Sequence, residues 1–278
     1  MDEIKAYDIG ALKINPGPVL DSCDKRVACS GCGKKVKFFC YHCHKATEEL
    51  EGRIPHIRLP FKLSVVKHAN ELDGKSTAIH SKIVAPEDVE IISYSETALS
   101  EIDAERTVLL FPGPDAKDIA EVDRKTFDRA VVIDGTWAQA KSMVRNNPKL
   151  TKLQKVTIKP RKTRFWRYQN VDDSYLATIE AIYFLYRDSV GDGYCGEHDA
   201  LMYFFKYFYD FIQSEYAAMP HKKFNTRHQK DYIAYETAAP HPGSRQDKRD
   251  TTAKVSFDFD HLPLDEMLQN LTSEPGRE

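Results

Sequence analysis

The segment Arg129-Ala-Val-Val-Ile-Asp134-Gly135-Thr136-Trp137-Ala-Gln-Ala-Lys-Ser-Met143 carries the clearest structural signal in the chain. Its first part is an apolar, β-branched run from Val131 to Ile133, which is typical of a buried strand. An acid and a glycine follow, and the next residues favour a helix with Thr136 as its N-cap. We therefore expect Asp134 at the carboxyl end of a strand, where open α/β sheets place ligand sites, although an acid here also suits a simple turn.

Short apolar runs on both sides of this segment are candidates for further strands. They occupy residues 63–67, 82–85, 89–93, 107–111 and 155–159. We expect helices where the sequence favours helix or apolar residues recur at helical spacing, over residues 138–145, 174–186 and 200–216. Strands that alternate with helices in this way predict an α/β fold.

A second strand end carries Phe111-Pro112-Gly113, where a fixed proline and a permissive glycine let the backbone approach a ligand closely. An ordinary turn also uses Pro-Gly, but beside the Asp134 loop this pair is typical of a cofactor crevice. Ser76 and Thr77 open a possible helix, where they either hold an anion or cap the helix. Thr178 lies in the first turn of another helix, which favours anionic ligands.

The composition limits the classes of protein to consider. The chain has 278 residues, enough for one or two domains, and 41% of them are hydrophobic. No apolar run approaches the roughly 18 residues of a membrane span, and the acidic start Met1–Lys5 does not resemble a secretory signal. We therefore expect an intracellular protein without a membrane segment, whose cysteines stay reduced.

The charge is strongly segregated although the formal net charge is only −2. Ten basic residues and no acid occur between Lys141 and Arg167, which suggests a polyanionic partner. The last part interleaves bases with aromatics, and we interpret five residues as RNA-binding: Arg161, Lys162, Arg164, Trp166 and Arg167. The alternative is a solvated basic loop with buried aromatics.

Four cysteines form a pair of CxxC turns, Cys29-x-x-Cys32 and Cys40-x-x-Cys43. Two such turns supply the four thiolates of a tetrahedral structural Zn²⁺ site. A redox role is the alternative, but a paired arrangement fits it poorly. Cys195 and His198 are spaced like a pair of metal ligands, but an isolated Cys/His pair in a loop usually binds no metal, so we do not assign one to them.

These features divide the chain into four parts. Residues 1–22 are expected to be a flexible or loosely packed arm, and residues 23–50 a zinc-binding knuckle. Residues 51–218 contain the predicted strands and helices of a catalytic domain. Residues 219–278 are polar and charged, so we expect a disordered tail. Basic clusters near Lys222 and Arg245 lead us to expect a nuclear protein that also occurs in the cytoplasm.

The ordered motifs resemble the DTW-domain family, the tRNA-uridine aminocarboxypropyltransferases. The name motif, Asp-x-Thr-Trp, stands at residues 134–137. The flanking matches are the CxxC pair, Leu110–Gly113, Arg161–Thr163, Trp166-Arg167 and Leu176–Ala181, and His68–His80 resembles the eukaryotic type. The resemblance covers about residues 23–215. Ala177 departs from it, because many relatives carry serine there, but Thr178 is kept.

This resemblance implies a SPOUT-like α/β domain with a knotted carboxyl-terminal half that binds S-adenosylmethionine. It also implies transfer of the 3-amino-3-carboxypropyl group to N3 of a uridine in tRNA, at position 20 of the D-loop, with release of methylthioadenosine. Alkylation of N3 requires loss of its proton, so Asp134 is the expected general base. Neither the oligomeric state nor the set of tRNAs follows from these residues.

The remaining site residues take their expected roles from the same resemblance. Thr136 and Trp137 complete the catalytic motif, with Trp137 against the adenosine, against the uracil or in the core. Phe111–Gly113 and Thr178 would contact S-adenosylmethionine, and Ser76 and Thr77 its carboxypropyl carboxylate. The rival interpretations are an RNA methyltransferase that uses S-adenosylmethionine and a non-catalytic zinc-ribbon module that binds RNA.

Overall fold

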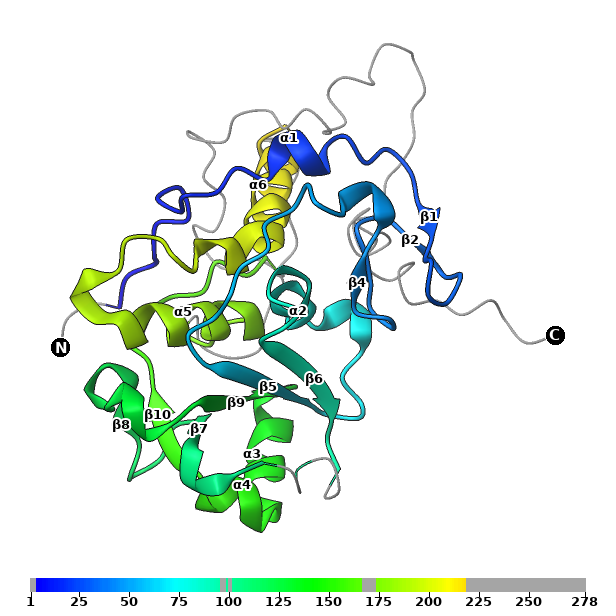
Figure 1. The fold of residues 1–278 in the computed structure, drawn as a ribbon. Helices are drawn as coiled ribbons and strands as arrows, with labels where there is room; N and C mark the ends of the chain where they lie inside the picture. Colours follow the sequence, from blue (N-terminus) through cyan, green and yellow to red (C-terminus); the bar gives the residue numbers. More distant parts are fainter. Residues whose placement is uncertain (1–3, 96–98, 100–101, 167–173, 219–278) are drawn as a thin grey trace.

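The fold is built on a six-stranded parallel sheet in a computed structural model that describes residues 4–95, 99, 102–166 and 174–218 (Figure 1). The strands are β5 (Lys62–Lys67), β6 (Val89–Ser93), β7 (Thr107–Leu110), β8 (Lys117–Asp118), β9 (Arg129–Asp134) and β10 (Gln154–Thr157). Their order is β6-β5-β9-β7-β10-β8, and every neighbouring pair is parallel. The expected α/β fold is confirmed.

Strand β9 lies at the centre of this sheet because both of its faces are apolar. Ala130 and Val132 point to one face, and Val131 points to the other. All three side chains are buried, which is the usual state of a strand covered on both sides. The register pairs Asp134 with Lys67 of β5, so the acid stands at the carboxyl end of the central strands.

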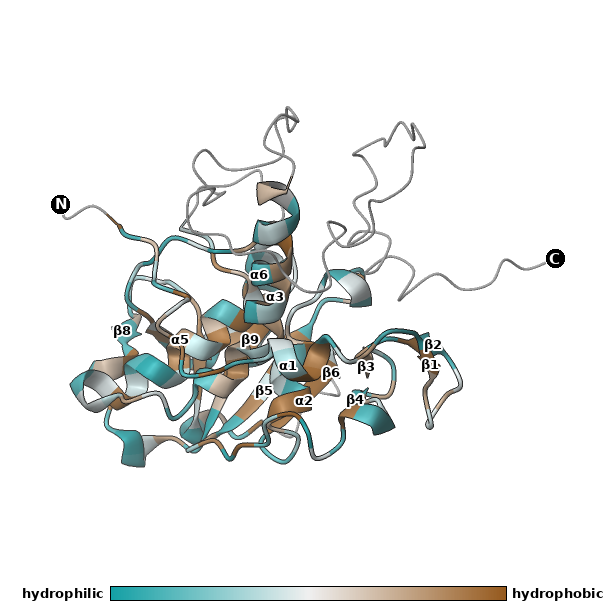
Figure 2. Cartoon of the chain, turned by 90° about the horizontal axis from the view of Figure 1, so that it is seen from above, coloured by the Kyte–Doolittle hydropathy of each residue, from teal (hydrophilic) through white to brown (hydrophobic). Residues whose placement is uncertain are grey.

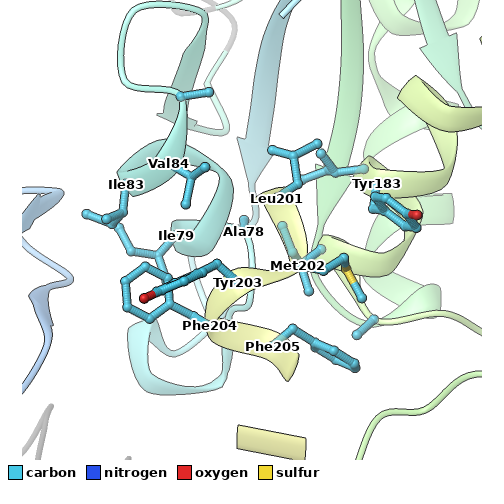
Figure 3. Packing of buried hydrophobic residues seen from close by; sticks show 14 of the residues in the cluster. Ala78, Ile79, Ile83, Val84, Tyr183, Leu201, Met202, Tyr203, Phe204 and Phe205 are labelled. Atoms are coloured by element: carbon cyan, nitrogen blue, oxygen red, sulfur yellow. The ribbon is translucent and has the colours of Figure 1, made fainter. Parts of the chain in front are cut away.

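Helices cover both faces of the sheet. One face packs against α2 (Ile79–Val84), α5 (Thr178–Val190) and α6 (Tyr203–Ala217), and the other against α3 (Trp137–Asn146) and α4 (Pro148–Lys152) (Figure 1). Aromatic residues at the start of α6 pack against α2, where Phe204 lies beside Ile79 (Figure 3). Apolar residues gather on β9 and α2 in the hydropathy view (Figure 2).

Most predicted elements occur where the sequence places them, with ends that shift by a few residues. Residues 82–85 are the exception, because Lys82–Val84 form the last turn of α2 and not a strand. Residues 199–202 form a 3-10 turn before α6 begins at Tyr203. That turn is η7 (Asp199–Met202), and the other 3-10 turns are η1 (Glu48–Leu50), η2 (Asp73–Lys75), η3 (Ala104–Arg106), η4 (Ile119–Glu121), η5 (Arg124–Thr126) and η6 (Gly191–Gly193).

The amino-terminal segment packs onto the domain, whereas the sequence suggested a flexible or loosely packed arm for residues 1–22. Its described part, residues 4–22, contains the short helix α1 (Gly17–Leu20) and buries Tyr7, Ile9 and Leu12. These apolar side chains join the core cluster that contains α5 and α6. A segment with little helical or strand periodicity thus contributes apolar side chains to the core.

Two small hairpins follow this arm. Strands β1 (Val27–Ala28) and β2 (Lys35–Val36) form the first, and β3 (Phe39–Cys40) and β4 (Lys45–Ala46) form the second. Within the described residues, no helix is both long enough and apolar enough to cross a membrane. The predicted disordered tail, residues 219–278, lies outside the described residues.

Candidate functional site

A pocket of about 900 Å³ opens at the carboxyl edge of the sheet. It lies where β7, β9 and β10 end and where α3 and α5 begin, so loops distant in sequence meet there. Its volume falls within the range of roughly 300–1,000 Å³ that is usual for small-molecule sites. Eight of the site residues selected from the sequence line it, namely Thr77, Phe111, Pro112, Asp134, Thr136, Trp137, Arg161 and Thr178, and so does Ala177, the departure noted above.

Asp134 lies at the base of this pocket with two hydroxyl groups on its carboxylate. Ser76 Oγ donates to Oδ2 and Thr178 Oγ1 donates to Oδ1, both at 2.7 Å. The side chain is only 2% exposed, and this burial raises the pKa of Asp134 while the two hydroxyls act to lower it. Each carboxylate oxygen retains a second lone pair, so Asp134 can still accept a proton from a bound ligand.

The hydroxyls of Ser76 and Thr77, expected to contact a ligand carboxylate, make internal bonds. Ser76 is bound to Asp134, and it does not line the pocket. Thr77 Oγ1 accepts from the backbone amide of Ile179 at 3.1 Å and thereby caps α5, whose own N-cap residue is an alanine. Thr77 thus satisfies one of the backbone amides at the start of α5, a helix other than the one that it was expected to open.

An aromatic wall forms one side of the pocket. The ring of Trp137 stacks on Phe111 with centroids 5.3 Å apart and meets the edge of Tyr175 at 5.5 Å. Thr136 caps α3 in a capping box with Gln139, as its position predicted, and so fixes the helix that carries Trp137. Such a wall offers a flat apolar surface to a purine or pyrimidine ring.

The loop after β7 approaches β10 closely. A Cβ on Gly113 would lie 2.9 Å from Cδ of Lys155, so a larger residue would displace that side chain. Phe111 and Pro112 face the pocket, whereas Gly113 does not line it. The glycine therefore sets the path of the loop and leaves the two preceding residues to face a ligand.

The residues interpreted as RNA-binding divide into two groups. Arg161 makes a bidentate pair with Asp188, at 2.6 and 2.8 Å, and its guanidinium lies over the ring of Phe184. Arg164 Nε donates to the carbonyl of Tyr7. Trp166 is 9% exposed and packs against aromatic rings of α6, so it lies in the core.

The other two residues of that set are Lys162, which contacts the arm through its backbone, and Arg167. The backbone of Lys162 pairs with the amino-terminal arm at Ala6, and its amide donates to the carbonyl of Lys5. Arg167 lies outside the described residues. The basic loop is thus attached to the arm along several consecutive residues.

Glu180, which the sequence did not single out beyond its motif, is the buried acid that joins these parts. It is fully buried and accepts four hydrogen bonds, from Tyr7 Oη, the Arg164 amide, Thr163 Oγ1 and the Ala177 amide, at 2.5–2.8 Å. Burial raises the pKa of Glu180, and these four donors counteract that effect. The signal available in the sequence was an acid at the third position of a helix.

Charged residues missed by sequence reasoning also line the pocket. Glu71 and Lys75 come from the segment after β5, and Lys159 comes from the segment after β10. With Asp134 and Arg161 they make both signs of charge available around one cavity. A ligand that carries an ammonium and a carboxylate finds partners for both groups here.

The four cysteines of the two CxxC turns come together although they lie on separate hairpins. Their Sγ atoms all lie within 4.8 Å of one another, and those of Cys32 and Cys40 are 3.5 Å apart. A tetrahedral Zn²⁺ with bonds of about 2.3 Å separates its sulfur ligands by roughly 3.8 Å, so the arrangement is consistent with zinc. A Cβ on Gly31 would lie 2.8 Å from the Cys43 sulfur, which explains the glycine in the first turn.

This cluster is the single group of three or more potential metal ligands that occurs in the described parts of the chain. Cys195 and His198 do not belong to this cluster. His198 is mostly buried between Tyr186 and Tyr194, whereas Cys195 is exposed.

The chain is similar to proteins of one family. The family model of the DTW domain matches residues 37–213. The tRNA-uridine aminocarboxypropyltransferase 1 of Xenopus tropicalis is 31% identical over 250 residues, which cover 72% of this chain and 85% of that protein. The proteins of the same name from Mus musculus and Homo sapiens are each 32% identical over 237 residues, covering 68% of this chain and 78% of each. No solved structure matches the chain significantly.

Proposed function

This chain belongs to the DTW domain family, and we propose that it transfers the 3-amino-3-carboxypropyl group of S-adenosylmethionine to N3 of a uridine in tRNA. The similar vertebrate proteins are named tRNA-uridine aminocarboxypropyltransferase 1. The observation that carries the proposal is the carboxylate of Asp134, buried and held by two hydroxyls at the base of a pocket. The implied target is position 20 of the D-loop.

The pocket residues fit S-adenosylmethionine. The aromatic wall of Phe111, Trp137 and Tyr175 suits an adenine or uracil ring, and Glu71 and Lys75 suit the ammonium and carboxylate of the amino acid part. When bound, the sulfonium supplies an activated carbon and a neutral leaving group. The volume of about 900 Å³ has room for more than one ring system.

Asp134 would act as the general base. It takes the N3 proton of uracil, N3 forms a bond to the carbon next to sulfur, and the electron pair of the broken carbon–sulfur bond stays on methylthioadenosine. A buried carboxylate with a raised pKa holds such a proton better than an exposed one. Thr178 and Ser76 keep the carboxylate oriented, and binding of the two substrates side by side in the site would align the reacting atoms.

The test supplies unmodified tRNA with S-adenosylmethionine labelled either in the methyl carbon or in the carboxypropyl carbons. Nucleoside mass spectrometry then identifies which label reaches uridine. We expect carboxypropyl label, and a rate about 10²–10⁴-fold lower for Asp134→Asn. Asp199→Asn is the matched control, since Asp199 is also buried and bound by hydroxyls but does not line the pocket.

Two other results would overturn the proposal. Methyl label on the RNA would make the protein a methyltransferase. Tight tRNA binding without any label would leave a zinc-containing RNA-binding module, and Asp134→Asn would then have no effect on binding.

We also propose that the four-cysteine cluster holds a structural Zn²⁺. Its four thiolates complete a coordination shell, so the metal would stabilise the two hairpins and take no part in the transfer.

The SPOUT-like, knotted arrangement implied by the resemblance is proposed for the sheet domain. The support is that the loops after β7 and β9 and the start of α5 meet at one pocket. An experimental structure traced continuously from 158 to 178 tests the knot.

Nuclear residence, with a cytoplasmic fraction, is a separate proposal. It rests on the basic clusters near Lys222 and Arg245, which lie outside the described residues. Fluorescence of a tagged chain should move to the cytoplasm when both clusters are replaced by alanines, and unchanged nuclear fluorescence would refute a role for them.

A further inference from the structure

The long basic stretch of the sequence forms two structurally different groups. Its last part is held by internal contacts, because Arg161 is paired with Asp188 and Arg164 binds the backbone of Tyr7. The side chain of Trp166 is buried among the rings of α6. Arg161 lines the pocket, and the internal contacts of Arg161, Arg164 and Trp166 make these side chains poor candidates for binding an additional phosphate.

The first part of the stretch lies on α3 and α4, in the layer below the sheet in Figure 1. Its four basic side chains are Lys141, Arg145, Lys149 and Lys152, which we call the α3–α4 track. All four are exposed, and none forms an ion pair with an acid of the described chain. The sequence has no Asp or Glu from 135 to 171, so these helices carry no acid of their own.

The track begins at the pocket. Trp137 lines the cavity, and Lys141 and Arg145 follow it at intervals of four residues along α3. Side chains four residues apart are neighbours on one helix face, with a rise of about 6 Å between them. The buried residues Met143 and Val144 pack against the sheet instead, so the basic row is directed away from the core.

The continuation on α4 has the same character. Lys149 and Lys152 are three residues apart and exposed, while Leu150 between them is buried against the sheet. Asn147 caps α4 by accepting from the amides of Lys149 and Leu150, which fixes the orientation of this short helix after α3. Four cations thus follow one another over two packed helices, starting from the cavity wall.

We propose that the α3–α4 track binds the phosphate backbone of the substrate tRNA at nucleotides beyond the one that enters the pocket. The inference rests on the proposed function, because an RNA whose uridine occupies the pocket must pass over its rim. Unpaired lysines and arginines bind phosphates with a large contribution from counterion release and without base specificity. The track would therefore recognise the tRNA through its backbone and not through its bases.

Charge reversal of the part nearest the pocket tests the proposal. The variant Lys141→Glu with Arg145→Glu is compared with Lys25→Glu with Lys125→Glu, two exposed lysines outside the track. Both variants change the net charge equally, so a difference between them reports the position of the charges. Filter binding of unmodified tRNA is measured from about 50 to 200 mM salt.

We expect the track variant to bind tRNA at least tenfold more weakly, and the slope of log K against log salt to become shallower by about 1.4 or more. The control should stay within about twofold of the wild-type affinity. Binding of S-adenosylmethionine, measured by calorimetry, should be the same in all three proteins because none of these residues lines the pocket. Lys149→Glu with Lys152→Glu should give a further loss in the same direction.

Equal tRNA affinity and equal salt slope in the track variant and the control would overturn this inference. The binding assay needs no catalysis, so it can succeed or fail independently of the label-transfer experiment. A wild-type protein that binds tRNA through the track but transfers no carboxypropyl label would refute the proposed activity and keep the inference.

Discussion

The carboxylate of Asp134 is held by hydroxyls from two distant parts of the chain. Ser76 precedes it by 58 residues and Thr178 follows it by 44. Both hydroxyls stabilise the charged form, in opposition to burial, which favours the protonated form. The availability of Asp134 as a base therefore depends on both contacts.

Replacing Thr178 by valine tests this balance. The change removes one donor to the carboxylate, so the pKa of Asp134 should rise further and the acid limb of the kcat/KM profile should move to higher pH. Activity near neutral pH should fall, and it should recover as the pH is raised. Thr178→Ser keeps the hydroxyl and is the control that should retain the wild-type profile.

A uniform loss of activity at every pH in Thr178→Val would contradict this interpretation. It would indicate that Thr178 contributes binding or packing without setting the protonation of Asp134. The comparison needs only steady-state rates of carboxypropyl transfer over a range of pH.

Sequence reasoning located these residues but not their bonds. A β-branched run followed by an acid was sufficient to place Asp134 at the end of β9, and the helix-start position of Thr178 was also predicted. Its bond to Asp134, and that of Ser76, depend on the crossing of the chain between β5, β9 and α5. Local propensity contains no information about such long-range contacts.

At the level of elements, the two small hairpins depend on their cysteines. Each consists of strands of two residues, which is too short for an isolated hairpin to be stable in water. The four sulfur atoms lie within 4.8 Å of one another, so a metal ion bound to all four would hold the two hairpins together. The regular CxxC spacing made this cluster predictable from sequence.

We expect the purified protein to contain one Zn²⁺ per chain, and Cys32→Ser to lose it. Because structural zinc contributes about 10–16 kcal/mol in small zinc domains, the variant should also unfold at a lower temperature. Cys195→Ser is the control, since that thiol is exposed and outside the cluster. Metal analysis and thermal unfolding give the readouts, and full zinc content in Cys32→Ser would contradict the assignment.

The contact between the amino-terminal arm and the basic loop was not predictable in the same way. Apolar residues of the arm do not recur at helical or strand spacing. The arm is attached through the bond of Tyr7 to Glu180, which lies more than 170 residues later in the chain. Buried polar partners of this kind satisfy one another only in the folded chain.

Tyr7→Phe should loosen this attachment. Loss of the bond to Glu180 removes a hydrogen bond to a buried acid, which contributes about 1.5–3 kcal/mol if Glu180 is charged. Hydrogen exchange at the amides of Lys162 and Arg164 should become faster. Tyr207→Phe, which removes a similar tyrosine bond to Asp21, should destabilise the protein without that local change, and equal exchange in both variants would refute the prediction.

The whole molecule is a three-layer domain whose last described helix is part of the core. Phe204 and Phe205 of α6 are completely buried, and Phe208 is nearly so. The α/β class, the sheet strands other than β8, and helices α3, α5 and α6 followed from hydrophobic period and turn residues, whereas β8 and α4 were not predicted. The strand order did not, because it depends on packing between segments far apart in sequence.

A chain that ends at residue 218 should keep its thermal unfolding temperature and its affinity for S-adenosylmethionine, because α6 ends at Ala217. A chain that ends at 202 is the control and should not fold. It loses several buried aromatic side chains, each of which contributes about 3–5 kcal/mol, against a total stability of roughly 5–15 kcal/mol. Failure of the 218-residue chain to fold would show that the rest of the chain is required.

The strand order also determines when the protein can fold during its synthesis. Strands β5 and β7 leave the ribosome before β9, yet β9 lies between them and pairs with both. A nascent chain that stops before residue 129 therefore has no central strand to join its two halves. Long-range parallel pairing of this kind is slow and leaves strand edges exposed. The facing edges of β5 and β7 therefore stay unpaired during synthesis until β9, which ends at Asp134, has emerged.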